Sequence, residues 1–403
     1  MKVCLLTPEF LPSWGGIGTY TYYLARALQD RAEVHVVTSR AGQRDIGEPG
    51  LEKVHVHALP SSSNERAGVS SLRFQIAVGK HLPRLVREHG FDIVHANHAQ
   101  MSDLLARVRG VRSESVVTVH TTVGTQLEGT LRAGVGPVAN GAEESVLRHR
   151  RILRILERRY LRRSRSLIFV SRWVRDRALL QYGIRPRRSQ VVRNAVDLEL
   201  FRPPVRSHEP GSAQRGPEDR TRAFTLLYAG RLLAQKGLGT LFAAMRELPA
   251  RVRLLVAGPG DPVPWREHAT GLGVHPDRIE FLGRVPYALM PDLYHRADAF
   301  VLPSFAESCP IVALEAMASG TPLIGSNVAG ISELVRDRET GWMFPVGDAK
   351  ALARCIQDVS EDGPPVERVT QQARSWVESH ATVGRMADET FHFYRSALGE
   401  VNT

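Results

Sequence analysis

Short apolar runs alternate with helix-period segments along most of the chain. Runs rich in β-branched residues and bounded by turn residues predict buried strands. In the first half these runs lie at Val3 to Thr7, Val34 to Thr38, Val54 to Leu59, Asp92 to Ala96, Ser115 to His120, Ser166 to Val170 and Gln190 to Val192. Helical patterns such as Thr19 to Gln29 and Arg73 to Glu88 follow several of them. This alternation predicts an α/β domain with a parallel sheet and helices on both faces.

The alternation stops at residues 202–223 and then restarts. That stretch holds Pro, Gly and charge without apolar periodicity, which predicts a linker. Further strands are predicted at Thr225 to Tyr228, Arg253 to Ala257, Ile279 to Leu282, Ala299 to Leu302 and Pro322 to Gly325. A chain of 403 residues exceeds what one hydrophobic core usually supports. We therefore expect two doubly wound domains, 1–201 and 224–375. A helical tail, 376–403, extends the second domain or packs back on the first.

Composition and charge exclude some classes of protein but leave several open. No apolar run reaches the length of a membrane helix, and the first residues turn polar too soon for a signal peptide, so we expect a cytoplasmic protein. Cys4, Cys309 and Cys355 lack the spacing of a zinc site or a disulfide framework. The net charge of +11 favours anionic partners, whether nucleotide-sugar phosphates, acidic lipid head groups or nucleic acid.

The segment from Pro303 to Gly320 is the most informative about a ligand site. An apolar strand ends at Pro303, and the good helix formers from Ile311 to Ala318 predict a helix that Gly320 stops. Glu307 and Glu315 therefore lie where a strand ends and a helix begins, the ligand-binding edge of an open α/β sheet. Free backbone N–H groups in the stretch from Ser308 to Ile311, which includes Cys309 and Pro310, together with the helix dipole, would point at an anionic ligand there.

Other polar groups follow the ends of other predicted strands. Gly15 and Gly16 lie between the first strand and the first helix, where glycine permits positive φ and close approach to a phosphate. His120 ends a strand, as a packed polar residue or as a hydrogen-bond donor to a sugar hydroxyl. Arg231 and Lys236 begin the second domain's first helix and suit a diphosphate, although isolated surface cations would look the same. Asn327 to Val335 and Gly341 to Pro345 predict a turn and a short capped helix.

These segments, taken in order, resemble the retaining glycosyltransferases of family 4 over nearly the whole chain. The resemblance rests on the glycine loop, Val119-His120, the stretch from Val192 to Asp197, Gly230-Arg231 with Lys236-Gly237, and the Glu-x7-Glu motif with Leu314-Glu315-Ala316-Met317-Ala318. It implies the GT-B fold, in which two Rossmann-like domains face each other across a cleft that closes on the substrates.

The resemblance also implies a role for each matching residue. Glu315 would bind the ribose hydroxyls of a nucleotide, and Glu307 the donor sugar. Arg231 and Lys236 would stabilise the leaving diphosphate. The amides of Gly15 and Gly16 would approach the phosphate, His120 the transferred sugar or the phosphate, and Asn194 would lie near the substrate. The backbone at Arg284 and Val285 would hold the base.

The reaction implied is transfer of a hexose or N-acetylhexosamine from a nucleotide diphosphate sugar to a hydroxyl on the same face of the sugar. No protein nucleophile and no cofactor take part. We expect no essential metal, since no Asp-x-Asp motif stands at the expected place. Ser308-Cys309-Pro310 replaces the Gly-Phe-Gly of many relatives and favours a UDP-sugar, and Ala195 and Ala329 replace glycines.

The segment from Arg148 to Arg163 has cations on most of its surface and an apolar stripe on one predicted helical face, formed by Ile152, Leu153, Ile155, Leu156, Tyr160 and Leu161. A basic amphipathic helix of this kind either binds an anionic membrane, at its inner face, or packs its apolar stripe on the sheet. No aromatic residues interleave with the charges, so we expect no nucleic-acid binding. The remaining alternatives for the whole chain are a non-catalytic nucleotide-sugar-binding scaffold and a GDP-mannose-dependent mannosyltransferase at a membrane. The acceptor stays open, since the regions expected to shape it, Ser61 to Val69 and Thr122 to Glu143, read as irregular loops.

Overall fold

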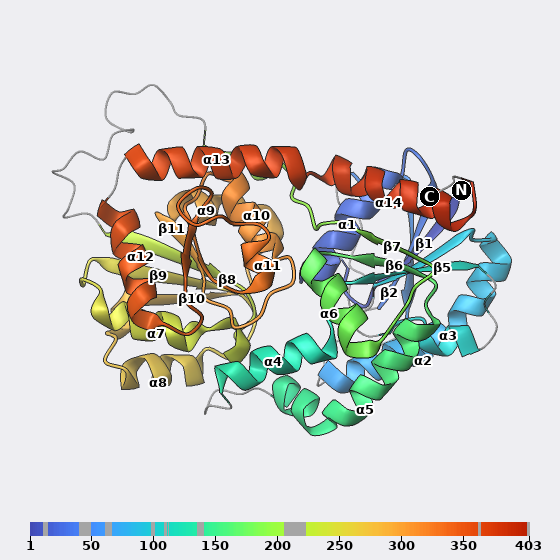
Figure 1. Cartoon of the computed structure of the whole chain (residues 1–403), viewed down its shortest axis with the longest axis horizontal. Helices are drawn as coiled ribbons and strands as arrows, with labels where there is room; N and C mark the ends of the chain where they lie inside the picture. Colours follow the sequence, from blue (N-terminus) through green and yellow to red (C-terminus); the bar gives the residue numbers. More distant parts are fainter. Residues whose placement is uncertain are drawn as a thin grey trace. The chain divides into compact units, whose positions relative to one another are not determined.

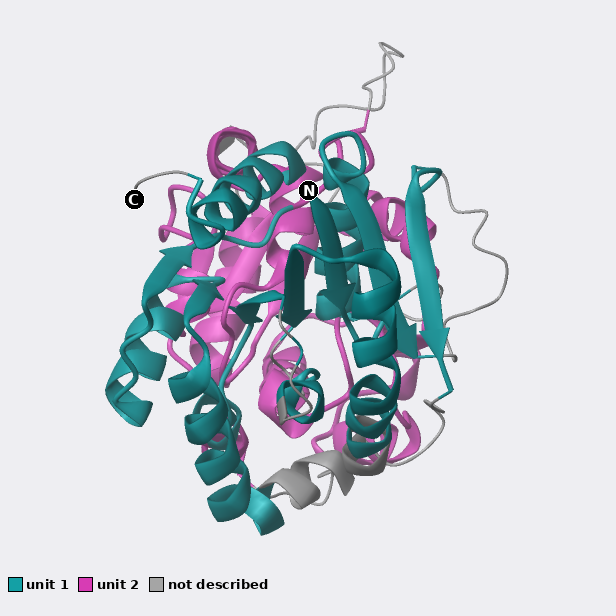
Figure 2. Cartoon of the chain, turned by 90° about the vertical axis from the view of Figure 1, so that its right-hand side faces the viewer, with its two compact units in different colours: residues 1–127, 141–195, 383–403 teal, residues 128–140, 196–382 magenta. Residues whose placement is uncertain are grey.

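The computed structural model describes residues 1–10, 15–39, 50–60, 67–97, 101–108, 111, 113–134, 141–204, 223–361 and 364–400. It divides into two compact units (Figures 1 and 2). Unit 1 consists of Met1–Leu127, Gly141–Ala195 and Val383–Thr403, and unit 2 of Glu128–Asn140 and Val196–Thr382. The expected linker falls largely on 205–222, outside the described residues, as do 61–66 and 135–140 of the acceptor regions.

Unit 1 contains a 7-stranded parallel sheet of order β3-β2-β1-β4-β5-β6-β7. Its strands are β1 (Lys2–Leu6), β2 (Glu33–Ser39), β3 (Val54–Leu59), β4 (Ile93–Asn97), β5 (Glu114–Val119), β6 (Ser166–Phe169) and β7 (Arg188–Val191). Its helices are α1 (Gly16–Leu28), α2 (Ala67–His89), α3 (Leu104–Val108), α5 (Gly141–Arg163), α6 (Arg172–Tyr182) and α14 (Val383–Ala397), and α4 (Val123–Ala133) spans the division between the units. The predicted strands of the first half all form.

Alternate residues of the central strands face different helices in unit 1. Val94 and Ala96 of β4 join a core with Phe74 and Val78 of α2. His95, between them, points to the other face, where its ring nitrogens bond Tyr394 of α14 and Thr118 of β5. Burial lowers the pKa of His95 to about 3, so the ring is neutral. This buried contact fixes the last helix to the first sheet.

Unit 2 contains a 6-stranded parallel sheet of order β10-β9-β8-β11-β12-β13. Its strands are β8 (Phe224–Ala229), β9 (Val252–Ala257), β10 (Ile279–Gly283), β11 (Ala299–Leu302), β12 (Leu323–Ser326) and β13 (Trp342–Phe344). Its α-helices are α7 (Leu238–Glu247), α8 (Val263–Gly271), α9 (Met290–Arg296), α10 (Ile311–Ala318), α11 (Ala329–Ser332), α12 (Ala349–Glu361) and α13 (Pro364–His380). Three 3₁₀ turns are η4 (Ala234–Lys236), η5 (Pro276–Arg278) and η6 (Tyr287–Leu289).

In the hydrophobic core of unit 2, alternate residues of a strand again face different helices. Ala299 and Val301 of β11 pack with Phe242 of α7 and Leu352 of α12. Phe300 faces the other way, against Tyr294 of α9 at 5.4 Å between ring centroids. Each sheet is therefore covered by helices on both faces, as the alternation of strands and helices predicted.

The structure changes three expectations about elements. Trp342–Phe344 forms the edge strand β13, because both aromatic side chains reach the second core, whereas the sequence predicted a turn there. Part of the expected acceptor loop, Thr122 to Glu143, is the helix α4. The expected tail boundary at 375/376 falls inside α13, which continues to His380, and the division between the units lies at 382/383.

Candidate functional site

In each unit the strand order reverses at a central pair of strands. In unit 2 that pair is β8 and β11, since β9 and β10 extend to one side and β12 and β13 to the other. Ligands of open α/β sheets bind beyond the carboxyl ends of the strands at such a switch point. Arg231 and Lys236 follow β8, and Glu307 follows β11. The structure therefore brings these predicted residues to one edge.

Lys236 and Glu307 form the centre of this edge. Lys236 Nζ lies 2.7 Å from Glu307 Oε1, and the two side chains are 21% and 10% exposed. The Ser304 hydroxyl donates to the same carboxylate oxygen at 2.7 Å. Ser304 was missed as a site residue, although it stands in the Pro-Ser pair that ends the strand. A cation and a carboxylate held this way at a sheet edge can position an anionic polyhydroxylated ligand.

Backbone contacts fix the loops that carry the pair. Phe305 N donates to Gln235 O at 2.8 Å, which ties the loop after β11 to the turn before α7. Gly237 has φ of 77°, and a Cβ added there would lie 1.9 Å from Pro303 O. A Cβ on Gly330 would lie 2.2 Å from Glu307 O. Both glycines are therefore required by close backbone approach.

Glu315, the fifth residue of α10, is 2% exposed. The hydroxyls of Tyr287 and Tyr294 donate to its two carboxylate oxygens, each at 2.8 Å. Burial raises the pKa of Glu315 to about 7, against the lowering effect of the two tyrosines. The sequence placed Glu315 inside the helix as observed, but it gave no indication of the tyrosines, which lie 28 and 21 residues away in the chain.

The amino end of α10 lies directly after Glu307. Cys309, Pro310 and Ile311 are buried, and Pro310 is the N-cap residue with no side-chain cap bond. Arg284 and Val285 follow β10, two strands from β8. Gly230 N donates to Ala257 O and Gly258 N to Gly283 O, so the loops after β8, β9 and β10 continue side by side.

In unit 1 the switch point lies between β1 and β4. Gly15 and Gly16 begin α1 after β1 and are exposed. Gly15 has φ of −120°, so it does not use the positive φ that glycine permits. Among the described residues, no side chain caps α1 and a Cβ built on Gly16 meets no neighbour within 4 Å, whereas one built on Gly15 would lie 2.7 Å from Glu9 Oε2.

His120 follows β5, and its Nε2–H donates to Asn97 Oδ1 at 3.1 Å. Its ring meets Tyr20 edge to face, 4.7 Å between centroids. Asn97, the last residue of β4, donates to Thr21 Oγ1 at 2.7 Å. The sequence analysis missed Asn97, although a polar residue ending a strand at the switch point was the available sign. Asn194 is buried after β7.

Two parallel, doubly wound units with polar groups at their carboxyl edges define the GT-B class of fold. The profile of Glycosyltransferase Family 4 matches residues 14–200, and that of Glycosyl transferases group 1 matches residues 213–376. The chain belongs to family 4 of the glycosyltransferases.

Curated relatives and solved structures match over almost the full length. Glycogen synthase of Mycobacterium tuberculosis is 28% identical, with 98% of this chain and 95% of the relative covered. A D-inositol 3-phosphate glycosyltransferase of Catenulispora acidiphila is 29% identical, with 95% and 91% covered. Sucrose-phosphate synthase from Thermosynechococcus elongatus has a TM-score of 0.78 at 22% identity, with 99% and 100% covered. HepE from Anabaena, solved with UDP-glucose, has a TM-score of 0.70 at 18% identity, with both chains fully covered.

Proposed function

We propose that this glycosyltransferase moves a hexose or N-acetylhexosamine from a nucleotide diphosphate sugar, with a UDP-sugar favoured, to a hydroxyl acceptor with retention of configuration. The observation that carries the proposal is the pair Lys236–Glu307 at the switch point of unit 2, beside the uncapped start of α10. The solved relative HepE holds UDP-glucose on a similar fold. Ser308-Cys309-Pro310 supports the same donor class.

In this proposal Lys236 and Arg231 stabilise the negative charge that develops on the diphosphate as the glycosidic bond breaks. Glu307 orients Lys236 and contacts the sugar. The leaving phosphate oxygen takes the proton of the attacking hydroxyl, which requires no protein nucleophile. The chemistry proposed here uses no cofactor and no metal at the donor, in keeping with the missing Asp-x-Asp motif. The start of α1 at Gly15 and Gly16 takes the phosphate, and His120 the transferred sugar.

Glu315 is assigned to the ribose. A carboxylate has about four acceptor positions, and the two tyrosine hydroxyls use two of them. The ribose hydroxyls share this carboxylate with Tyr287 or take its place. Since hydrogen bonds to a charged group contribute about 1.5–3 kcal/mol, Glu315→Gln should weaken nucleotide binding about 10- to 100-fold at a pH above about 7, where the carboxyl group is ionised. Tyr287→Phe, which leaves the carboxylate intact, is the matched control.

The donor is tested by thermal unfolding with UDP-glucose, UDP-N-acetylglucosamine and GDP-mannose, each with and without the Glu315 substitution. Stabilisation by a UDP-sugar that Glu315→Gln removes supports the proposal, whereas preference for GDP-mannose supports the mannosyltransferase alternative. Release of free sugar or of a glycoside from the donor excludes the non-catalytic scaffold. The anomeric configuration of the product, read by NMR, decides retention: an inverted product would refute the mechanism.

We also propose peripheral contact with an anionic membrane through α5. No described helix is long and apolar enough to cross a membrane. On one side of α5, Glu157, Tyr160 and Leu161 are buried. On another, Ile152 and Ile155 are 60% and 55% exposed among arginines. The apolar stripe expected from the sequence is therefore divided between the core and the surface, and the exposed part suits an acidic lipid surface.

Flotation with vesicles of phosphatidylglycerol in phosphatidylcholine, at physiological salt, tests this contact. Ile152→Ser with Ile155→Ser should abolish binding to the acidic vesicles. Val263→Ser, at another exposed apolar residue, on α8, should not change it. No flotation of the wild type, or equal flotation with neutral vesicles, would show that α5 does not recognise an acidic surface.

A further inference from the structure

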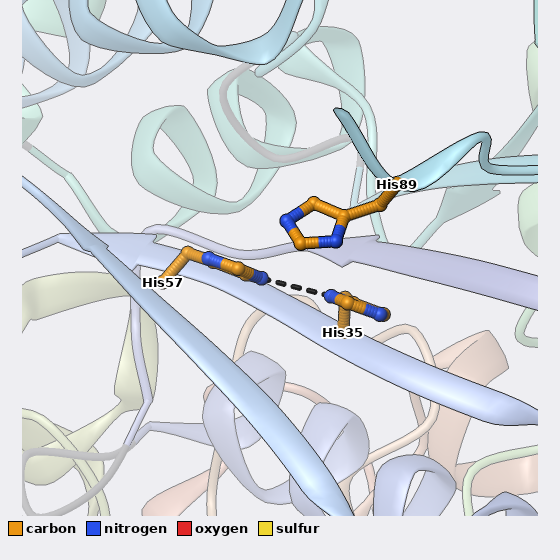
Figure 3. A group of neighbouring side chains, drawn as sticks. All are labelled: His35, His57 and His89. Atoms are coloured by element: carbon orange, nitrogen blue, oxygen red, sulfur yellow. Dashed lines mark hydrogen bonds between the residues drawn. The ribbon is translucent and has the colours of Figure 1, made fainter. Parts of the chain in front are cut away.

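Three histidines lie close together at the edge strand of the sheet in unit 1. They are separate from the candidate site at the carboxyl ends of the strands. His35 lies on β2, His57 on the edge strand β3, and His89 is the last residue of α2 (Figure 3). One ring nitrogen from each lies within 4.8 Å of the others. His35 is buried, and His57 and His89 are half-buried. The resemblance to family 4 did not draw attention to any of them.

Strand register explains why the rings gather. His35 pairs with His55 and Val37 with His57, so His35, His55 and His57 share the face of the sheet that α2 covers. Gly90, with φ of 66°, follows His89 and ends α2 there. Phe91 closes the floor, with its ring centroid 4.9 Å from that of His35 and 5.6 Å from that of His89. The positions of the three rings are therefore fixed by β2, β3 and α2, and by their packing on Phe91.

The protonation of His35 suits ligation. Its Nε2 lies 3.0 Å from Glu33 Oε1, so the Nε2–H donates to that carboxylate. Its Nδ1 lies 2.8 Å from His57 Nε2, and only one proton fits between two neutral rings. That proton is therefore on His57 Nε2, which donates to His35 Nδ1. When His57 Nε2 binds a metal, the proton leaves it for His57 Nδ1 or for solvent.

We propose that His35 Nδ1, His57 Nε2 and a ring nitrogen of His89 bind one Zn²⁺ ion, with water as the fourth ligand. Imidazole nitrogens bind zinc at about 2.0–2.1 Å, which sets them about 3.3 Å apart in a tetrahedral site. The three nitrogens now lie within 4.8 Å of one another, and rotation of the side chains has to bring them to that spacing when the ion binds. Glu33 then has the role of the carboxylate that orients a metal-bound histidine.

The same region offers a second set of ligands, Glu33, His35 and His55. Glu33 and His55 are exposed, and Lys2 Nζ lies 3.2 Å from the Glu33 carboxylate. Using Glu33 as a ligand would also remove the group that fixes the tautomer of His35. The set with His57 and His89 is favoured for both reasons. It would join the edge strand β3 and the end of α2 to β2, a structural cross-link that is separate from the transfer reaction.

The test uses the full chain without an affinity tag, stripped with a chelator and then dialysed against Zn²⁺. We expect about one bound zinc per chain and a higher melting temperature. His57→Gln and His89→Gln should each lower zinc affinity more than about 100-fold, and Glu33→Gln about 10- to 100-fold. His392→Gln, at an exposed histidine of α14, and His55→Gln should leave affinity within a few-fold of wild type.

Three results would overturn the proposal. The first is less than stoichiometric zinc on the wild type at concentrations that saturate ordinary three-histidine sites. The second is zinc retained by both His57→Gln and His89→Gln, and the third is loss of zinc in His55→Gln with retention in His89→Gln, which would assign the site to the second set. Co²⁺ absorption in the visible range distinguishes a tetrahedral site from loosely bound ion, and an octahedral spectrum would count against the geometry proposed.

Discussion

The two sheets of this protein have the same order around their switch points, but they present different chemistry there. In unit 1 the hydrogen-bonded pair after the central strands is an imidazole and an amide, His120 and Asn97, and the Glu9 carboxylate lies close to Gly15, where α1 begins. In unit 2 the pair is ionic, Lys236 with Glu307, and Arg231 lies at the same edge. One topology can therefore carry an imidazole–amide pair or an ion pair at its carboxyl edge, depending on a few residues in its loops. The proposed function assigns the charge development of the reaction to unit 2.

Removing Lys236, the paired cation of unit 2, tests the contrast between the two edges most directly. Lys236→Ala should lower kcat about 10³-fold, because loss of one group that stabilises transition-state charge costs about that much. Lys236→Arg should recover part of the rate. Lys350→Ala, at an exposed lysine of α12, is the control and should change nothing. Steady-state rates with the donor identified by thermal unfolding give the answer, and a Lys236→Ala rate within a few-fold of wild type would refute the assigned role.

The strands and the charged residues of unit 2 could be predicted from the sequence, because they depend on residues that are close together in the chain. Strand runs, the helix from Ile311 to Ala318 and the positions of Lys236 and Glu307 all follow from neighbours in the chain. The partners of Glu315 could not be predicted, because two tyrosines far away in the sequence reach it only through packing of α9 and η6. The pair His35–His57 depends likewise on strand register, although His55-Val56-His57, alternate residues of one strand, was a visible sign.

A buried titratable group in each unit should make the stability of the folded protein depend on pH, in opposite directions. The pKa of Glu315 in unit 2 rises from 4.5 to about 7, so the folded state keeps a proton that the unfolded state releases. Its stabilising contribution is full below about pH 4.5 and is lost as pH rises through about 7, by at most about 3 kcal/mol. His95 in unit 1, whose pKa falls to about 3, contributes stability above pH 6.5 that is lost on acidification.

Urea unfolding of wild type, Glu315→Gln and His95→Gln between pH 4.5 and 8 measures these contributions. The stability of wild type relative to Glu315→Gln should fall as pH rises, and that relative to His95→Gln should increase. Parallel curves for all three proteins would mean that neither buried group changes its protonation on folding.

The placement of Glu307 can be perturbed without touching its charge. Gly330→Ala would put a Cβ 2.2 Å from Glu307 O and 2.7 Å from Ser308 C, so the loop must shift by about 1 Å. A displacement of that size costs about 10² in rate where geometry matters. Gly271→Ala, with open space around its Cβ, is the matched control. Full activity of Gly330→Ala with an unchanged circular dichroism spectrum would show that Glu307 does not need this position.

The smallest effect is expected at the imidazole–amide pair of unit 1. His120→Ala removes one hydrogen-bonding ring, so kcat/KM should fall only about tenfold, in line with the net value of an ordinary hydrogen bond. His120→Gln retains an amide N–H toward Asn97 and should lose less. Kinetics of both variants beside Lys236→Ala test whether the His120–Asn97 pair and the Lys236–Glu307 pair differ in this way. A loss for His120→Ala as large as that for Lys236→Ala would mean that unit 1 also acts on the bond being broken, and the division of roles between the two edges would be wrong.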